Sequence, residues 1–179
     1  AVTDSRISVS GLETSASLQG DSKIIPFLRD MGVNIQSEGE SVWVGSSSLQ
    51  ATEIDAKNHP DLVPPLAAVA CYAKGTTRIV NAERLRIKES DRLAALSAEL
   101  SKMNAKIRET KDGLEITGSS NLKGANVDSQ GDHRIAMACA VAALAAQGET
   151  TITGTDCVAK SYPTFFEDLK RLGGNIVGK

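Results

Sequence analysis

Short strand-like runs recur along this chain, and each is followed by a polar loop and a helical pattern of apolar residues. The runs R-I-S-V, R-I-V-N and T-I-T-G begin at Arg6, Arg78 and Thr151, so their spacings are 72 and 73 residues. A repeat of this length predicts stacked units with a shared core, because one unit cannot bury its apolar face alone. We therefore predict a single domain over residues 1–179, with repeat units at about residues 5–75, 76–148 and 149–179.

Two kinds of helix are predicted within these units. An amphipathic helix follows each strand-like run, and the three segments have similar endings at Ile35, Ile107 and Ile176, which implies one buried stripe in each. In the first two units, strand-like stretches and an Ala-rich segment follow. The segments Leu66 to Ala73 and Ile135 to Ala146 are apolar nearly all round, which is typical of buried helices. The third unit stops after its first helix, and we expect it to be incomplete.

Charge and composition narrow the class of ligand. The chain has 20 Lys and Arg against 22 Asp and Glu, a formal net charge of -2, and no basic stripe. We therefore expect neither a nucleic acid nor a membrane as partner, and we expect a small ligand. Three cysteines without C-x-x-C spacing, no signal-like start and no spanning apolar stretch favour a cytoplasmic location. No motif requires a cofactor, and neither His59 nor His133 has a second metal ligand at usable spacing.

Cations stand at three expected helix starts, where free N–H groups and the macrodipole disfavour positive charge unless an anion is present. Because the repeat bundles these helices, their starts can converge on one rim of the domain. Such a rim favours recognition of a substrate with several phosphate or carboxylate groups. The cations are Lys88, Arg92, Arg134 and Lys160, and the expected N-caps are Ser90 or Asp91, Asp132 and Ser161, with Asp61 capping the buried helix of the first unit.

Acid–base chemistry at this rim would fall to Asp61, Glu89 and Lys160, because neighbouring charges shift pKa values. Each residue also has an ordinary interpretation. Taken alone, Asp61 could be a simple helix cap and Lys160 could be a solvated surface lysine. The segment K-E-S-D-R could likewise be an exposed helix start. The combination of four cations at three helix starts favours the functional interpretation.

Several segments resemble the signatures of the 5-enolpyruvylshikimate-3-phosphate synthase family. They are L-R-I-K-E-S-D-R-L at Leu85, G-D-H-R-I-A-M at Gly131 and A-K-S-Y-P at Ala159, joined by H-P-D at His59 and Q-G-D at Gln19. The resemblance implies one of two similar lobes, in which three α/β units surround buried parallel helices as an inside-out α/β barrel. It also implies that the start of a full-length chain completes the unfinished third unit.

The same resemblance implies a reaction and a set of roles. The family transfers the enolpyruvyl group of phosphoenolpyruvate to the 5-hydroxyl of shikimate 3-phosphate, a step of aromatic amino acid biosynthesis. Asp61 resembles the base that takes the hydroxyl proton, and Glu89 and Lys160 resemble the groups that handle the proton at the enolpyruvyl carbon. The substrate-binding residues implied are Arg92 and Arg134 for phosphoenolpyruvate, with His133 beside them, and Lys88 for shikimate 3-phosphate, whereas Arg84 replaces an Asn of many members and receives no role.

Motifs of the family's other lobe are absent from these residues: the N-terminal K-S motif, the G-T loop and the S-S-Q segment. We therefore expect the missing lobe to be a partner and the chain alone to be inactive, because closure of two lobes would expel water and orient the substrates. Three alternatives remain open. They are enolpyruvyl transfer to a UDP-amino sugar, a non-catalytic lobe that only assembles with a complementary fragment, and a repeat protein that only binds anions.

Overall fold

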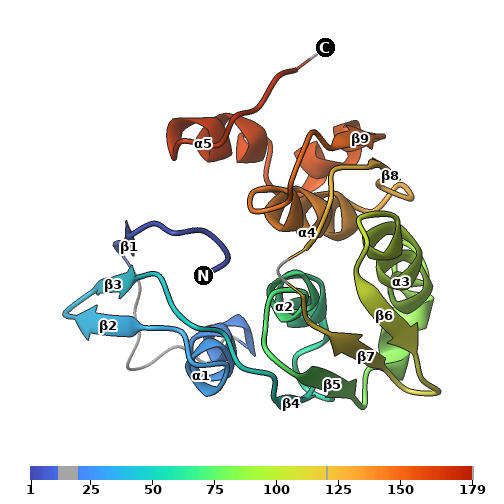
Figure 1. The fold of residues 1–179 in the computed structure, drawn as a ribbon, viewed down its shortest axis with the longest axis horizontal. Coiled ribbons are helices and arrows are strands. Elements are labelled where there is room, and N and C mark those ends of the chain that lie inside the picture. The colour runs from blue at the N-terminus through green and yellow to red at the C-terminus, as the bar shows by residue number, and fades with distance from the viewer. Residues whose placement is uncertain (12–19, 120, 179) are drawn as a thin grey trace.

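The computed structural model describes residues 1–11, 20–119 and 121–178, which form a mixed α/β fold (Figure 1). The predicted α/β class is confirmed. Gln19, the first residue of the Q-G-D segment, lies outside the described residues. No helix within the described ranges is long and apolar enough to cross a membrane.

A small antiparallel sheet and one short helix open the fold. Strand β3 (Ser41–Val44) pairs with β1 (Ile7–Val9) on one side and with β2 (Ile35–Glu38) on the other. Helix α1 (Ile24–Asp30) follows the 3-10 turn η1 (Gly20–Lys23) and contains no buried residue. The apolar stripe predicted for this helix is nevertheless present in partly buried form, because Ile24, Phe27 and Leu28 pack against the core and the C-cap Met31 is 0% exposed. In Figure 1 the helix lies between the small sheet and α2.

A buried helix connects the next two strands. Strand β4 (Glu53–Asp55) leads through the 3-10 turn η2 (Pro60–Leu62) into α2 (Val63–Ala70), and the chain returns as β5 (Thr76–Val80). Strands β4 and β5 are parallel, and parallel neighbours need a long crossover connection, which α2 provides. Helix α2 therefore begins at the end of the domain where β4 finishes.

The second sheet is completed by a hairpin that follows an amphipathic helix. After η3 (Glu83–Ile87) and α3 (Arg92–Lys102), strand β6 (Lys106–Glu109) pairs antiparallel with β7 (Leu114–Thr117), which also pairs antiparallel with β5. The strand order is β4-β5-β7-β6. This sheet lies beside α2 and α3 (Figure 1).

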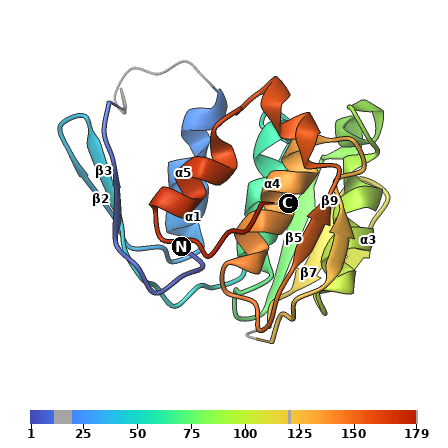
Figure 2. The same cartoon turned by 90° about the horizontal axis from the view of Figure 1, so that it is seen from above.

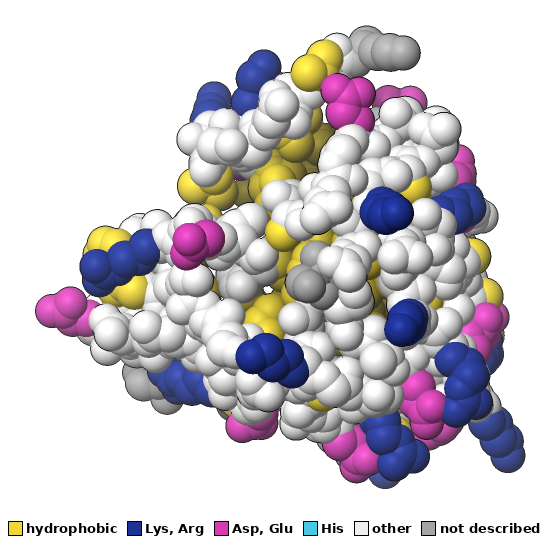
Figure 3. Space-filling view, in the orientation of Figure 1, with side chains coloured by type: hydrophobic (Ala, Val, Ile, Leu, Met, Phe, Trp, Pro, Cys, Tyr) yellow, Lys and Arg dark blue, Asp and Glu magenta, His cyan; other side chains and the backbone are white. Residues whose placement is uncertain are grey.

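A second crossover has the same form as the first. Strand β8 (Asn126–Asp128) leads into the buried helix α4 (His133–Ala143), and β9 (Thr151–Thr153) returns parallel to β8. The 3-10 turn η4 (Thr155–Lys160) then packs against α4, and the chain continues into α5 (Phe165–Arg171). Helix α5 contains no buried residue, and none of its apolar side chains packs against the described core, so the buried stripe predicted for it is absent. Figure 3 shows apolar side chains in a recess beside this helix.

Helices α2 and α4 pack against each other at the centre of the fold (Figure 2). Small side chains allow helix axes to approach closely, and the Tyr72 hydroxyl donates a hydrogen bond to the Ala142 carbonyl across this contact. The two predicted buried helices are confirmed, although both end before Ala73 and Ala146. The buried small residues of the two helices, and of the turn that follows α2, include Ala67, Ala70, Cys71, Ala138, Cys139 and Ala142.

The amphipathic pattern of the second unit is confirmed in α3, whose apolar stripe is fully buried. The helix ends earlier than its sequence ending suggests, because Asn104 adopts a positive φ of 67° that a helix cannot continue. Ile107 lies in β6 instead, and Ile35 likewise lies in β2. The buried stripe consists of Leu93, Leu96, Leu100 and Met103, each 0% exposed.

Candidate active site

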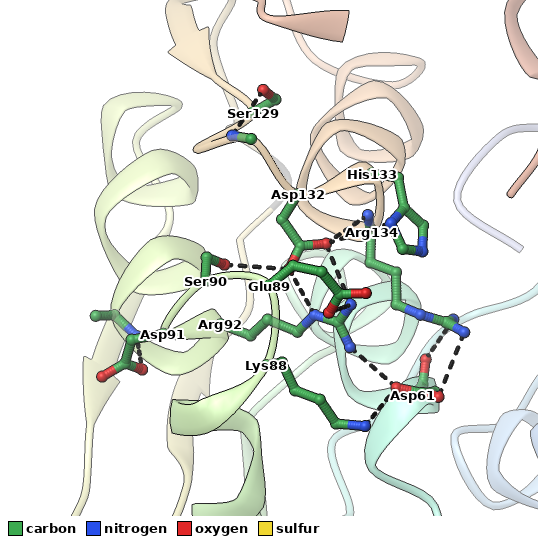
Figure 4. A network of polar contacts seen from close by, with 12 residues as sticks. Asp61, Lys88, Glu89, Ser90, Asp91, Arg92, Ser129, Asp132, His133 and Arg134 are labelled. Carbon is green, nitrogen blue, oxygen red and sulfur yellow. Dashed lines mark hydrogen bonds and ion pairs between the residues drawn. The ribbon is translucent and has the colours of Figure 1, made fainter. Parts of the chain in front are cut away.

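The starts of α3 and α4 meet beside η2, and their polar side chains form one network (Figure 4). Asp132 is the N-cap of α4, and its carboxylate accepts a hydrogen bond from the backbone N–H of Arg134 at 2.9 Å. The predicted cap is therefore confirmed. The same carboxylate also accepts a bond from the Ser90 hydroxyl at 3.1 Å. Ser90 consequently contacts the α4 cap, while Asp91 caps α3 by accepting from the N–H of Ala94.

Arg92, the first residue of α3, is the centre of the network. Its side chain is 1% exposed. Its Nε donates to Oδ2 of Asp132 at 2.7 Å, and its Nη2 donates to Oδ1 at 3.2 Å. The same guanidinium donates from Nη1 to Asp61 at 2.9 Å and from Nη2 to Glu89 at 2.7 Å. Arg92 therefore joins three carboxylates that come from three separate segments of the chain.

Asp61 does not cap a helix, contrary to the sequence interpretation. It lies inside η2, and α2 begins at Val63 without a side-chain cap. The Asp61 carboxylate instead contacts three cations: Arg92 at 2.9 Å, Arg134 Nη2 at 3.4 Å and Lys88 Nζ at 3.7 Å. The 3-10 turn places the carboxylate toward these side chains, which bind it in place of backbone N–H groups. Asp61 is thus the common counter-ion of the solvent-facing cations.

The remaining side chains of the network differ in their access to solvent. Lys88, Glu89 and Arg134 have side chains that are 34%, 43% and 27% exposed. Arg134 also donates from Nη1 to the backbone carbonyl of Asp61 at 3.1 Å, which links α4 to η2. His133 is mostly buried, and its Nδ1 lies 3.9 Å from Asp132. An incoming anion would therefore meet Lys88 and Arg134 before it reached Arg92.

Lys160 stands apart from this network. It is the last residue of η4, not the residue before a capped helix start, because α5 begins only at Phe165 after the N-cap Thr164. Its side chain is exposed, and no hydrogen bond or ion pair joins it to another described residue. The structure therefore brings together six of the seven predicted site residues and leaves Lys160 on the neighbouring turn.

Two supporting roles, those of Arg86 and of Asp132 as a partner of Arg92, were not identified from the sequence. Arg86 of η3 donates to Asp91 at 3.0 Å and to Glu109 at 3.0 Å, and it also donates to the Thr110 carbonyl, so it fixes the loop that carries Lys88 and Glu89. Asp132 was assigned only as a cap, although it also neutralises Arg92. The position of Asp132 directly before His133 and Arg134 was the feature of the sequence that could have indicated this second role. Nothing in the local sequence distinguishes Arg86 from a solvated arginine.

Burial and pairing shift the pKa values of the central pair. Burial alone raises the pKa of Asp132, but hydrogen bonds from Arg92, from the Arg134 N–H and from Ser90 outweigh it, so the pKa lies below its usual value. Burial alone lowers the pKa of Arg92, but Asp132, Glu89 and Asp61 reverse this and raise it. Both groups are therefore charged at neutral pH.

The free energy of unfolding should depend on this carboxylate at acid pH. A group whose folded-state pKa is lowered stabilises the fold above its unfolded pKa, and this contribution disappears as the pH falls through the folded value. We expect constant urea midpoints between neutral pH and about pH 5, and a decrease below about pH 4. Urea unfolding at a series of pH values would measure this, and a midpoint that rises on acidification would contradict it.

Three cations and three carboxylates at converging helix starts form a polar site suited to anions. Within the described ranges, no three His, Cys, Asp or Glu side chains are placed to hold a metal ion together. The charged groups present can bind phosphate or carboxylate groups and can exchange protons with a bound substrate. The site is therefore suited to a ligand that carries several anionic groups.

Comparison with known proteins agrees with this geometry. A family model described as EPSP synthase (3-phosphoshikimate 1-carboxyvinyltransferase) matches residues 1–169. The chain belongs to the EPSP synthase family. The match includes every residue of the network and also Lys160.

Individual members of the EPSP synthase family are similar over nearly the whole chain. The 3-phosphoshikimate 1-carboxyvinyltransferase of Clostridium kluyveri is 50% identical over 170 residues, covering 95% of this chain and 40% of its own length. That of Methanocella arvoryzae is 50% identical over 178 residues, covering 98% and 42%. An EPSP synthase structure from Acinetobacter baumannii superposes with a TM-score of 0.83 at 29% identity, covering 97% of this chain and 43% of the other. The chain thus spans about two fifths of these proteins.

Proposed function

We propose that this chain is one lobe of an enzyme that transfers the enolpyruvyl group of phosphoenolpyruvate to the 5-hydroxyl of shikimate 3-phosphate. The observation that carries the proposal is the network around Arg92, in which helix starts, cations and carboxylates meet at one place. Both proposed substrates are multiply anionic, and the network offers two partly exposed cations, Lys88 and Arg134. Membership of the EPSP synthase family supports the same reaction.

The proposed roles follow from exposure and contacts. Arg134 and Arg92 bind phosphoenolpyruvate, with His133 beside them, and Lys88 binds shikimate 3-phosphate. Asp61 accepts the proton of the 5-hydroxyl, because its carboxylate is partly exposed and lies among the cations that would hold the substrate. Glu89 and Lys160 exchange the proton at the enolpyruvyl carbon. Lys160 would have to approach the substrate from η4, which packs against α4.

The proposed architecture is a single domain of three α/β units around buried parallel helices, as in an inside-out α/β barrel. Two crossovers of the same form, through α2 and α4, support this arrangement. A complementary lobe is the proposed partner, and the apolar recess beside α5 is a suitable place for additional chain to pack (Figure 3). We propose a cytoplasmic location, where free cysteines such as Cys71 and Cys139 remain reduced.

Catalysis is proposed to need both lobes. The charged side chains of the network bind mainly one another, and Asp61 and Glu89 compete with any anion for the cations. Closure of a second lobe would exclude water and strengthen the interactions with substrate. The isolated chain is therefore expected to bind ligands weakly and to lack turnover.

Backbone NMR titration would test this function. Addition of phosphoenolpyruvate and shikimate 3-phosphate, separately and together, should shift the amides of Asp61, Lys88 to Arg92, Arg134 and Lys160, while that of Lys106, the first residue of β6, serves as the unperturbed reference. Turnover should appear only after the remaining part of a relative, such as that of Clostridium kluyveri, is added. Silent site amides together with an inactive mixture would refute the proposal. Tighter binding of a UDP-amino sugar than of shikimate 3-phosphate would refute the proposed acceptor.

A further inference from the structure

A second charged residue is buried on the same face of α3 as Arg92. Glu99 lies seven residues, or about two helical turns, after Arg92, and both side chains are 1% exposed. Its Oε2 accepts hydrogen bonds from Lys102 Nζ at 2.6 Å and from the backbone N–H of Asp128 at 2.9 Å. Its Oε1 accepts from Gln130 Nε2 at 2.8 Å. Two of these three donors belong to the segment that precedes α4.

The segment of residues 128–132 is fixed by further hydrogen bonds. Asp128 accepts from the N–H of Gln130 at 2.7 Å, and the Ser129 hydroxyl donates to the Gly154 carbonyl at 2.8 Å. Gln130 and Gly131 both have positive φ, at 54° and 68°, which turns the chain sharply. The segment ends at Asp132, whose carboxylate binds Arg92. Its conformation therefore determines where the Asp132 carboxylate lies.

We propose that Glu99 is a positioning residue for the anion-binding site. Helix α3 binds the 128–132 segment at two places, through Glu99 at Asp128 and Gln130 and through Arg92 at Asp132. The first contact sets the position of the second, so Glu99 orients the Arg92 guanidinium through the segment without touching a ligand. The proposal rests on the proposed function only in identifying the site that this geometry serves.

The chemistry of a carboxylate suits this position. An ionised carboxylate accepts bonds on both oxygens, whereas a glutamine amide has one accepting oxygen and one donating NH₂ group. In a Glu99→Gln variant, the NH₂ group would face one of the two donors from residues 128 and 130. A buried ion pair alone contributes little net stability compared with apolar packing. Glu99 therefore has a geometric effect beyond its pairing with Lys102.

The matched variants Glu99→Gln and Lys102→Gln separate positioning from simple ion pairing. Both remove the charge pair between residues 99 and 102, but only the first disturbs the contacts to the 128–132 segment. The readouts are water exchange of the Arg92 Nε–H proton, observed by NMR, and the affinity for inorganic phosphate. We expect Glu99→Gln to accelerate exchange and to weaken phosphate binding, each about tenfold, because bonds to a charged acceptor are lost. We expect Lys102→Gln to leave both nearly unchanged.

Equal behaviour of the two variants in both readouts would overturn the inference. If Glu99→Gln does not fold, Gln130→Ala removes one of the two segment contacts at an exposed residue, and it should accelerate Arg92 Nε–H exchange several-fold. Unchanged exchange in Gln130→Ala would then refute the role. If the unmodified chain does not bind phosphate and stays inactive when the second lobe is added, the proposed function fails, while exchange of the Arg92 proton still decides the role of Glu99.

Discussion

Replacement of Asp61 by Asn should make the chain bind inorganic phosphate about tenfold more tightly, although the substitution alters a proposed catalytic residue. Asp61 lies within ion-pair distance of Arg92, Arg134 and Lys88, and it neutralises the charge that an incoming anion needs. An amide keeps an oxygen that accepts a hydrogen bond from Arg92, but it removes the competing negative charge. Isothermal titration with phosphate would measure the change.

The same variant should lose activity once the second lobe is present. A general base accelerates proton transfer by roughly 10²- to 10⁴-fold, so turnover of the reconstituted enzyme should fall by a similar factor. Asp30→Asn, at the exposed end of α1, is the charge-matched control and should change neither quantity. Weaker phosphate binding in Asp61→Asn would show that the carboxylate organises the cations more than it competes for them.

Replacement of Asp132 by Asn should lower the free energy of unfolding by about 3–5 kcal/mol. The carboxylate is 0% exposed and is paired with a guanidinium that is 1% exposed, so the neutral amide would leave the buried charge of Arg92 without its main partner. The cap of α4 would also weaken, because a neutral oxygen accepts the Arg134 N–H less strongly. Urea denaturation followed by circular dichroism would measure the loss.

The control for this experiment is Asp156→Asn, which removes an exposed carboxylate from η4. It should leave the urea midpoint nearly unchanged, because substitutions at exposed positions rarely change the free energy of unfolding by more than about 0.5 kcal/mol. If Asp132→Asn lowers the free energy of unfolding no more than the control does, then water or a neighbouring carboxylate must neutralise the Arg92 guanidinium in place of Asp132.

The sequence was sufficient to predict the helices that are determined by their own residues. The period of Leu93, Leu96 and Leu100 identified α3, and a cap at Ser90 or Asp91 marked its start, of which Asp91 is the residue that caps the helix. The Ala-rich segments were recognised as buried helices because they have no polar face. The partial burial of α1 and the exposure of α5 were not predictable in this way, since both depend on which other segments pack beside those helices.

Most residues of the candidate site were predicted from the sequence, but not all of their contacts were. Convergence of the cationic helix starts was expected from the repeat, and Arg92 and Arg134 do meet. Asp61 was assigned as a cap because an Asp before an apolar helix usually caps it, whereas three cations distant in sequence bind its carboxylate instead. The location of Lys160 within η4 was missed, because the following serine and proline resemble a helix start.

The ion-paired network also affects how fast a substrate can arrive. Its three cations and three carboxylates balance, and the whole chain has a formal net charge of -2. A dianion approaching from beyond about 10 Å therefore meets little attractive field, so the lobe does not steer its substrate electrostatically over long distances. We expect the association rate to be limited by diffusion and by the time that Asp61 and Glu89 take to release the cations. A change in ionic strength therefore alters the lifetime of the bound state more than the frequency of encounters.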